Sequence, residues 1–146
     1  MPLQNPPSGV GEPGRCPPNA REIAPAGNAI LVAAGLQTNT IALSGVNPQH
    51  RGISVFVNIS GAPGGTTPTL TVTISAVDPV SGALVTLLVS AALNAAGCTL
   101  LQVYPGLPAT ANVSANAVLP SQWQVSYTIG GTTPTFTGTI DAVLQP

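Results

Sequence analysis

Three segments of the chain alternate between apolar residues and mostly small or polar ones: 53–59, 70–76 and 123–129. A fourth segment, 136–144, places four apolar side chains on one face: Phe136, Ile140, Ala142 and Leu144. Successive side chains of a β-strand point to opposite sides, so a period of two predicts strands with one buried and one solvent-exposed face. Such strands enclose a core in a sandwich or a barrel.

Four weaker segments bring the number of predicted strands to about eight: 30–34, 40–44, 84–90 and 99–104. Turns rich in Gly, Pro and Asn separate them, and in 78–82 Asp78 is expected to be a turn-forming acceptor rather than a catalytic acid. The pattern predicts an all-β fold, an antiparallel β-sandwich of Ig-like or jelly-roll-like kind, over residues 29–146. Its predicted core includes Trp123, Val125, Tyr127 and Ile129.

An eleven-residue sequence occurs twice, at 64–74 and at 130–140, with nine identical positions. Each copy follows one predicted strand and opens another. We therefore expect a hairpin that is used twice, at related places in two sheets. Pro68 and Pro134 are expected at strand starts or edges, where the missing N–H costs no ladder hydrogen bond.

Residues 1–28 contain seven prolines and no aromatic residue. Proline fixes its own backbone and disfavours helix at the preceding residue, so this segment predicts an extended, polyproline-like arm rather than part of a core. The predicted organisation is an N-terminal arm, 1–28, followed by a single domain, 29–146.

Charged residues make up only 5% of the chain, which contains no lysine. Four of the seven charges lie in the first 22 residues. A net charge of -1 leaves no basic surface for nucleic acid or anionic membrane, and we expect neither partner. Such a neutral, hydroxyl-rich surface suits a protein that packs beside copies of itself; the alternative is a secreted or extreme-environment module solvated by its hydroxyl groups.

The beginning of the chain lacks the basic and apolar regions of a signal peptide, and no stretch is long enough for a membrane helix. We therefore expect synthesis in the cytoplasm, with export only as part of an assembly. The spacing of Cys16 and Cys98 is not that of a metal motif, and a cytoplasmic origin favours two free thiols over a disulfide.

The sequence offers few candidate residues for catalysis. The single histidine, His50, has only Asp78 and Asp141 as carboxylates in the predicted domain, and no Gly-x-Ser-x-Gly motif accompanies it. No His/Cys/Asp cluster has the spacing of a metal site. We expect no enzymatic activity, no cofactor and no metal.

A 17-residue connection, 105–121, separates two predicted strands. Connections of this length without secondary structure are uncommon and are usually functional or cross between sheets. Its apolar, uncharged composition indicates that either its own domain or a neighbouring subunit covers it.

Between Gly52 and Gln145 the chain resembles the capsid decoration (cement) proteins of tailed bacteriophages. The resemblance rests on three stretches and the tryptophan after the third: 77–82 (VDPVSG), 103–108 (VYPGLP), 117–120 (AVLP) and Trp123. Gln122 and Gln124 stand where the family carries basic residues. The resemblance implies a β-sandwich that assembles as a symmetric oligomer, with a trimer expected, and whose partners are the major capsid protein and other copies of itself.

The function expected from the sequence is to decorate and stabilise a phage capsid on the virion surface by bridging capsomers. The expected contact residues lie in the arm and in the 105–121 connection: Pro6, Pro7, Arg15, Pro17, Pro18, Arg21, Leu107, Val113 and Leu119. Two alternatives stay open, a tail or head-fibre structural module and a carbohydrate-binding or adhesive Ig-like module. The second would need exposed aromatic residues, for which only Phe56 and Tyr104 are candidates.

Overall fold

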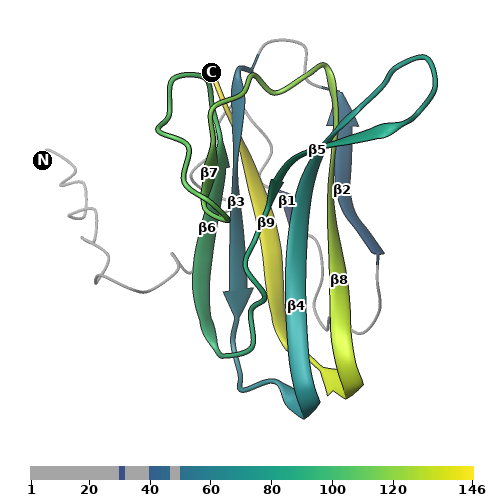
Figure 1. Cartoon of the computed structure of the whole chain (residues 1–146), viewed down its shortest axis with the longest axis vertical. Helices are drawn as coiled ribbons and strands as arrows, with labels where there is room; N and C mark the ends of the chain where they lie inside the picture. Colours follow the sequence, from purple (N-terminus) through teal and green to yellow (C-terminus); the bar gives the residue numbers. More distant parts are fainter. Residues whose placement is uncertain (1–29, 32–39, 47–49) are drawn as a thin grey trace, which may run out of the picture.

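The computed structural model describes residues 30–31, 40–46 and 50–146, and this part of the chain is all-β, with no helix. Its strands form one five-stranded and one four-stranded sheet (Figure 1). The strands are β1 (Ile30–Leu31), β2 (Thr40–Val46), β3 (Gly52–Ile59), β4 (Gly64–Val77), β5 (Leu84–Val89), β6 (Gly97–Val103), β7 (Ser114–Ala115), β8 (Gln122–Thr135) and β9 (Gly138–Gln145).

The five-stranded sheet has the order β1-β9-β3-β6-β7 and the four-stranded sheet the order β2-β8-β4-β5. All neighbouring strands are antiparallel except β6 and β7, which are parallel. The all-β prediction is therefore confirmed. The structure describes only the first two residues of the predicted strand 30–34, and the predicted arm, 1–28, lies outside the described residues.

One hydrophobic core draws on both sheets. The alternating positions of β3, β4, β8 and β9 supply most of it, as the period of two predicted. Trp123, Val125 and Tyr127 are buried, while Ile129 is partly buried and packs against the same cluster. The outward positions of β4 carry threonines, which need no cover from an apolar layer.

Trp123 is the largest buried side chain, at 2% exposure, and its indole Nε1 has no hydrogen-bond partner. We expect Trp123→Ala to lower the free energy of unfolding by about 3–5 kcal/mol, because it removes packing and leaves a cavity. Trp123→Phe should cost less, since it fills more of the space and removes the unpaired N–H. Denaturant unfolding measures both; Val118→Ala, at an exposed site, is the control. A cost below about 1 kcal/mol for Trp123→Ala would contradict the burial.

The two copies of the repeat lie in one sheet, which corrects the expectation of related places in two sheets. Their shared Gly-Gly-Thr-Thr-Pro-Thr segments pair with each other, with Gly64 opposite Thr135 and Thr69 opposite Gly130. The glycine at the start of each copy thus faces the threonine at the end of the other. The paired segments 64–69 and 130–135, called here the repeat ribbon, are therefore related by a local two-fold axis. Beyond the repeat ribbon the copies diverge, because 70–74 continue β4 whereas 138–140 enter β9 in the other sheet.

The repeat ribbon is close-packed backbone on backbone. A Cβ on Gly65 would lie 2.5 Å from the carbonyl oxygen of Thr133, and one on Gly131 would lie 2.7 Å from that of Thr67. Gly65 and Gly131 have φ of 96° and 114°, which disfavours any side chain. Pro68 and Pro134 lie inside β4 and β8, not at strand starts, but register shifts flank Thr66 there, and prolines are tolerated at such bulges.

A graded series of glycine substitutions tests this packing. Gly131→Ala should cost about 2 kcal/mol or more, because it adds both a positive-φ side chain and a clash. Gly106→Ala, with φ of 89° but open space around it, should cost about 1 kcal/mol. Gly61→Ala has neither problem and should be near neutral. Equal unfolding free energies for all three variants would show that the repeat ribbon does not pack this way.

Candidate contact surfaces

Asp78 and Asp141, the two carboxylates considered for catalysis, belong to different sheets: Asp78 follows β4 and Asp141 lies on β9. Asp78 sits in the β4–β5 turn, where its carboxylate accepts hydrogen bonds from the Ser81 hydroxyl and from the Val80 N–H, 3.0 Å away. These bonds, that from Ser81 first, hold the pKa of Asp78 below its ordinary value. The predicted role as a turn-forming acceptor is confirmed.

Asp141 lies on β9, on the face of the five-stranded sheet that points away from the core. It is 9% exposed, and Thr139 donates a hydrogen bond of 3.3 Å to its Oδ2. In register it stands next to Phe56 on β3. No group of three or more His, Cys, Asp or Glu residues that could hold a metal occurs among the residues that the structure describes.

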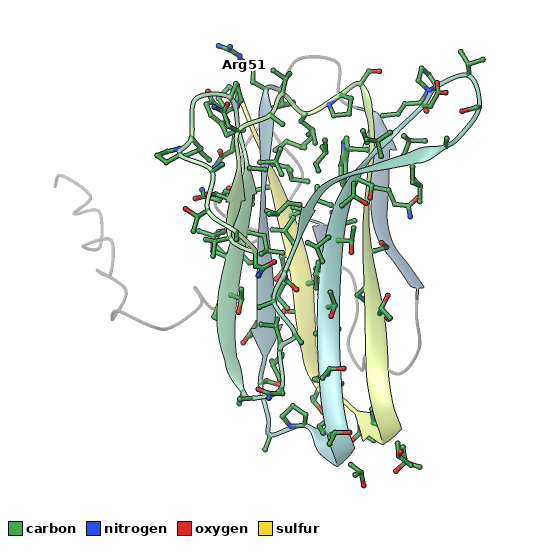
Figure 2. All side chains as sticks on the ribbon, in the orientation of Figure 1. Arg51 is labelled. Carbon is green, nitrogen blue, oxygen red and sulfur yellow. The ribbon has the colours of Figure 1, made fainter. Side chains whose placement is uncertain are left out.

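The 105–121 connection is an ordered crossover from β6 in one sheet to β8 in the other. Its residues 114–115 form β7, parallel to β6, and Tyr104 N–H donates to the Ala115 carbonyl over 3.1 Å. Asn116 Oδ1 accepts from Gly106 N–H over 2.8 Å. Leu119 N–H donates to the Arg51 carbonyl over 2.9 Å, at the end of the molecule marked by Arg51 in Figure 2. The connection therefore crosses between the two sheets, which was one of the two interpretations of its length.

The predicted contact residues fall into three groups. Six of them lie outside the described residues: Pro6, Pro7, Arg15, Pro17, Pro18 and Arg21. Leu119 is 2% exposed and belongs to the core, so its side chain packs against its own domain. Val113 is 47% exposed and Leu107 is partly exposed, which leaves both available for contact.

A more exposed apolar group lies elsewhere, on the β4–β5 hairpin. Val80 is 93% exposed, Val85 58% and Leu84 52%. The turn between these strands stands away from the rest of the molecule, at the upper right of Figure 1. The sequence carried a signal for this, because Leu-Val-Thr-Leu-Leu-Val in 84–89 does not alternate as a half-buried strand does.

The described residues include no exposed cluster of aromatic side chains of the kind that binds carbohydrate. Trp123, Tyr127 and Phe136 are buried, at 2%, 5% and 3% exposure. Tyr104 is partly exposed, and its hydroxyl donates to the carbonyl oxygen of Pro146 over 2.9 Å. Phe56 is partly buried on the outward face of its sheet.

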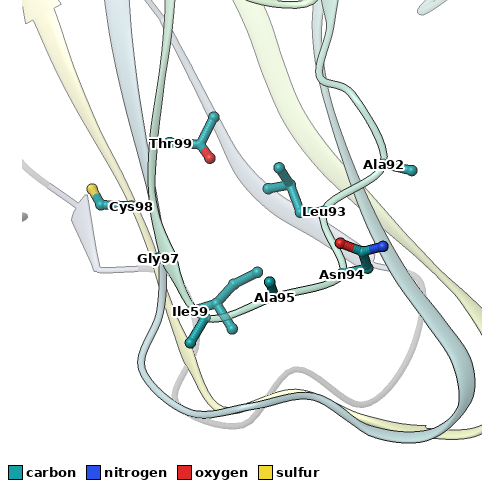
Figure 3. A pocket seen from close by; sticks show the side chains of 9 residues that line it. Ile59, Ala92, Leu93, Asn94, Ala95, Gly97, Cys98 and Thr99 are labelled. Atoms are coloured by element: carbon teal, nitrogen blue, oxygen red, sulfur yellow. The ribbon is translucent and has the colours of Figure 1, made fainter. Parts of the chain in front are cut away.

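A shallow hollow of about 220 Å³ opens between the end of β3 and the start of β6 (Figure 3). Its lining is small and uncharged, with Ile59, Leu93 and Asn94 as its larger residues. Cys98 also lines it, and this cysteine is disulfide-bonded. The prediction of free thiols is thus wrong at Cys98. The one other cysteine of the chain, Cys16, lies outside the described residues.

Comparison with known proteins finds no family model, no curated protein and no solved structure that matches this chain. Within the described residues, no helix has the length and apolarity needed to cross a bilayer.

The bonded state of Cys98 can be measured directly. We expect alkylation of the denatured, non-reduced protein to leave Cys98 unmodified, and reduction beforehand to make it reactive. Peptide mapping by mass spectrometry reads both states and identifies the bonded partner. Full alkylation of Cys98 without reductant would show that the bond does not form in solution.

Proposed function

We propose that this chain is a non-enzymatic structural protein of a virion, which decorates the phage capsid and stabilises it by bridging capsomers. In this proposal the two sheets form a β-sandwich of Ig-like or jelly-roll-like kind. The shared core of the two sheets and the repeated passage of the chain from one sheet to the other support that architecture.

The observation that carries the proposal is the lack of surface charge. Residues 50–146 contain three charged residues, Arg51, Asp78 and Asp141, and the last is only 9% exposed. An ordinary soluble domain has roughly a quarter of its residues charged, and net charge normally keeps free molecules apart. A surface this neutral is suited to permanent packing against other subunits.

Exposed apolar side chains add to this argument. Val80, Val85 and Val118 are each more than half exposed. They lie on the β4–β5 hairpin and on the crossover, the latter a segment that the sequence indicated as a contact surface. Burying such side chains stabilises an assembly by roughly 25 cal/mol per Å² of apolar area removed from water.

In the proposed decoration, each copy need contribute only a small stabilisation to the shell. A shell carries many copies, so a modest contribution from each contact lowers the free energy of the closed shell by a large total. The major capsid protein and other copies of the chain, as a trimer, are the proposed partners. The proposed contacts of the arm are Pro6, Pro7, Arg15, Pro17, Pro18 and Arg21.

Locating the chain in particles tests the proposal. We expect an antibody against the full chain to label the heads of purified virions in immunogold electron microscopy, in many copies per head. Label confined to tails or fibres would replace decoration with the tail-module alternative. Absence from particles would overturn a virion role altogether.

Rebinding supplies a second measurement. Full-length protein added to heads that lack it should saturate at a fixed stoichiometry and raise the temperature at which the heads rupture. Saturation without any rise in rupture temperature would contradict the stabilising role while leaving attachment intact.

A further inference from the structure

The distal part of the β4–β5 hairpin has two exposed faces. Leu84, Val85 and Thr86 are all exposed, although neighbouring residues of a strand point to opposite sides. Neither face of the strand is therefore covered here. An isolated two-stranded ribbon is only marginally stable in water, so an apolar one that projects from the body is suited to contact with something else.

The turn holds this ribbon in a defined shape. Asp78 N–H donates to the Ala83 carbonyl and Gly82 N–H to the Asp78 carbonyl, each over 2.8 Å. Ser81 and Val80 donate to the Asp78 carboxylate, and Gly82 has φ of 72°. A ribbon ordered in this way loses little conformational entropy when it docks.

β5 is also an edge strand, and no strand of the described residues pairs with its free side. Hydrogen-bonded and non-hydrogen-bonded pairs alternate along an antiparallel ladder. Because Ala83 bonds to Asp78 and Val85 stands opposite Ala76, the backbone groups of Leu84 and Thr86 point away from β4. Proteins usually guard such edges with charge, with proline or with very short strands. The edge strands of the five-stranded sheet, β1 and β7, are very short, with two residues each. β5 has six residues and contains neither a charged residue nor a proline.

We propose that β5 pairs with β5 of a second copy of this chain, antiparallel and about a two-fold axis at Val85. Leu84 of each copy then hydrogen-bonds with Thr86 of the other, and the two Val85 side chains form the central cross-strand pair. The four-stranded sheet thereby continues from one subunit into the next. In the proposed multi-copy function this two-fold contact would join neighbouring trimers rather than the subunits of one trimer. The inference itself concerns the isolated protein.

A second copy fits this edge better than a charged partner does. No charged residue occurs between Asp78 and Asp141, so no like charges meet across the axis. Antiparallel pairing also sends the two Asp78 turns to opposite ends of the joined ribbon. At about 3.3 Å per residue they are separated by well over the ~8 Å screening length of physiological salt. The self-association should therefore depend little on salt concentration.

Sedimentation velocity of the full chain over a range of concentrations tests the pairing. Wild-type protein should show a reversible self-association, and Val85→Lys should weaken it roughly tenfold or more, because two ammonium groups would stand directly opposite each other. Thr128→Lys is the matched control, since Thr128 is also exposed but lies on β8, an inner strand of the same sheet. It should associate like wild type. A wild type that stays monomeric, or a Val85→Lys variant that associates unchanged, would overturn the proposal.

A cysteine variant reports the register independently of any loss of folding. Val85→Cys should form a disulfide with its own copy under mild oxidation, because cross-strand pairs lie within disulfide range. Non-reducing electrophoresis should show a covalent dimer for Val85→Cys and little for Thr128→Cys. Equal cross-linking of the two variants would exclude this interface. Head labelling in virions could still succeed in that case, so the two proposals fail separately.

Discussion

The pairing of β4 with β8 is the constraint on which the rest of the structure depends. These are the two longest strands, and their ladder runs from the Gly64–Thr135 pair to the Ala76–Trp123 pair. A slip of one residue would turn every side chain to the opposite face, moving Trp123 out of the core and threonines into it. The repeat helps to set this register, because its glycines admit close backbone approach only where the two copies meet in their two-fold arrangement.

Of the four sheet edges in the described residues, two are formed by the two-residue strands β1 and β7, and two by the longer strands β2 and β5 of the four-stranded sheet. β7 belongs to the crossover that also delivers Leu119 to the core. The crossover thus supplies both an edge strand of the five-stranded sheet and a side chain of the core. At the four-stranded sheet, Leu84, Val85 and Thr86 at the start of β5 are exposed on both faces, and the backbone groups of Leu84 and Thr86 point away from β4.

The scarcity of charged side chains connects the fold to its proposed function. In most domains charged residues on the outer positions of strands keep sheet edges from pairing with other chains. Here most of those positions carry Thr, Ser or Gln, and the Asp78 carboxylate accepts hydrogen bonds within its own turn. In the proposed assembly, such a composition lets subunits meet without burying charge, which would carry a desolvation cost.

The sequence by itself determined β3, β4, β8 and β9 and the side of each that is buried, because alternation is a local property that burial on one face imposes. It also identified the Asp78 turn, whose bonds join residues within five positions of one another. What it could not decide was which strands pair: the repeat suggested two sheets, yet its copies pair within one, since partner choice depends on loop paths and packing far from the repeat. Likewise Leu119 resembled a surface residue of a long loop, and Cys98 a free thiol. Only the tertiary structure decided that the crossover passes over the core and that Cys98 is bonded, because both depend on segments brought together from distant parts of the chain.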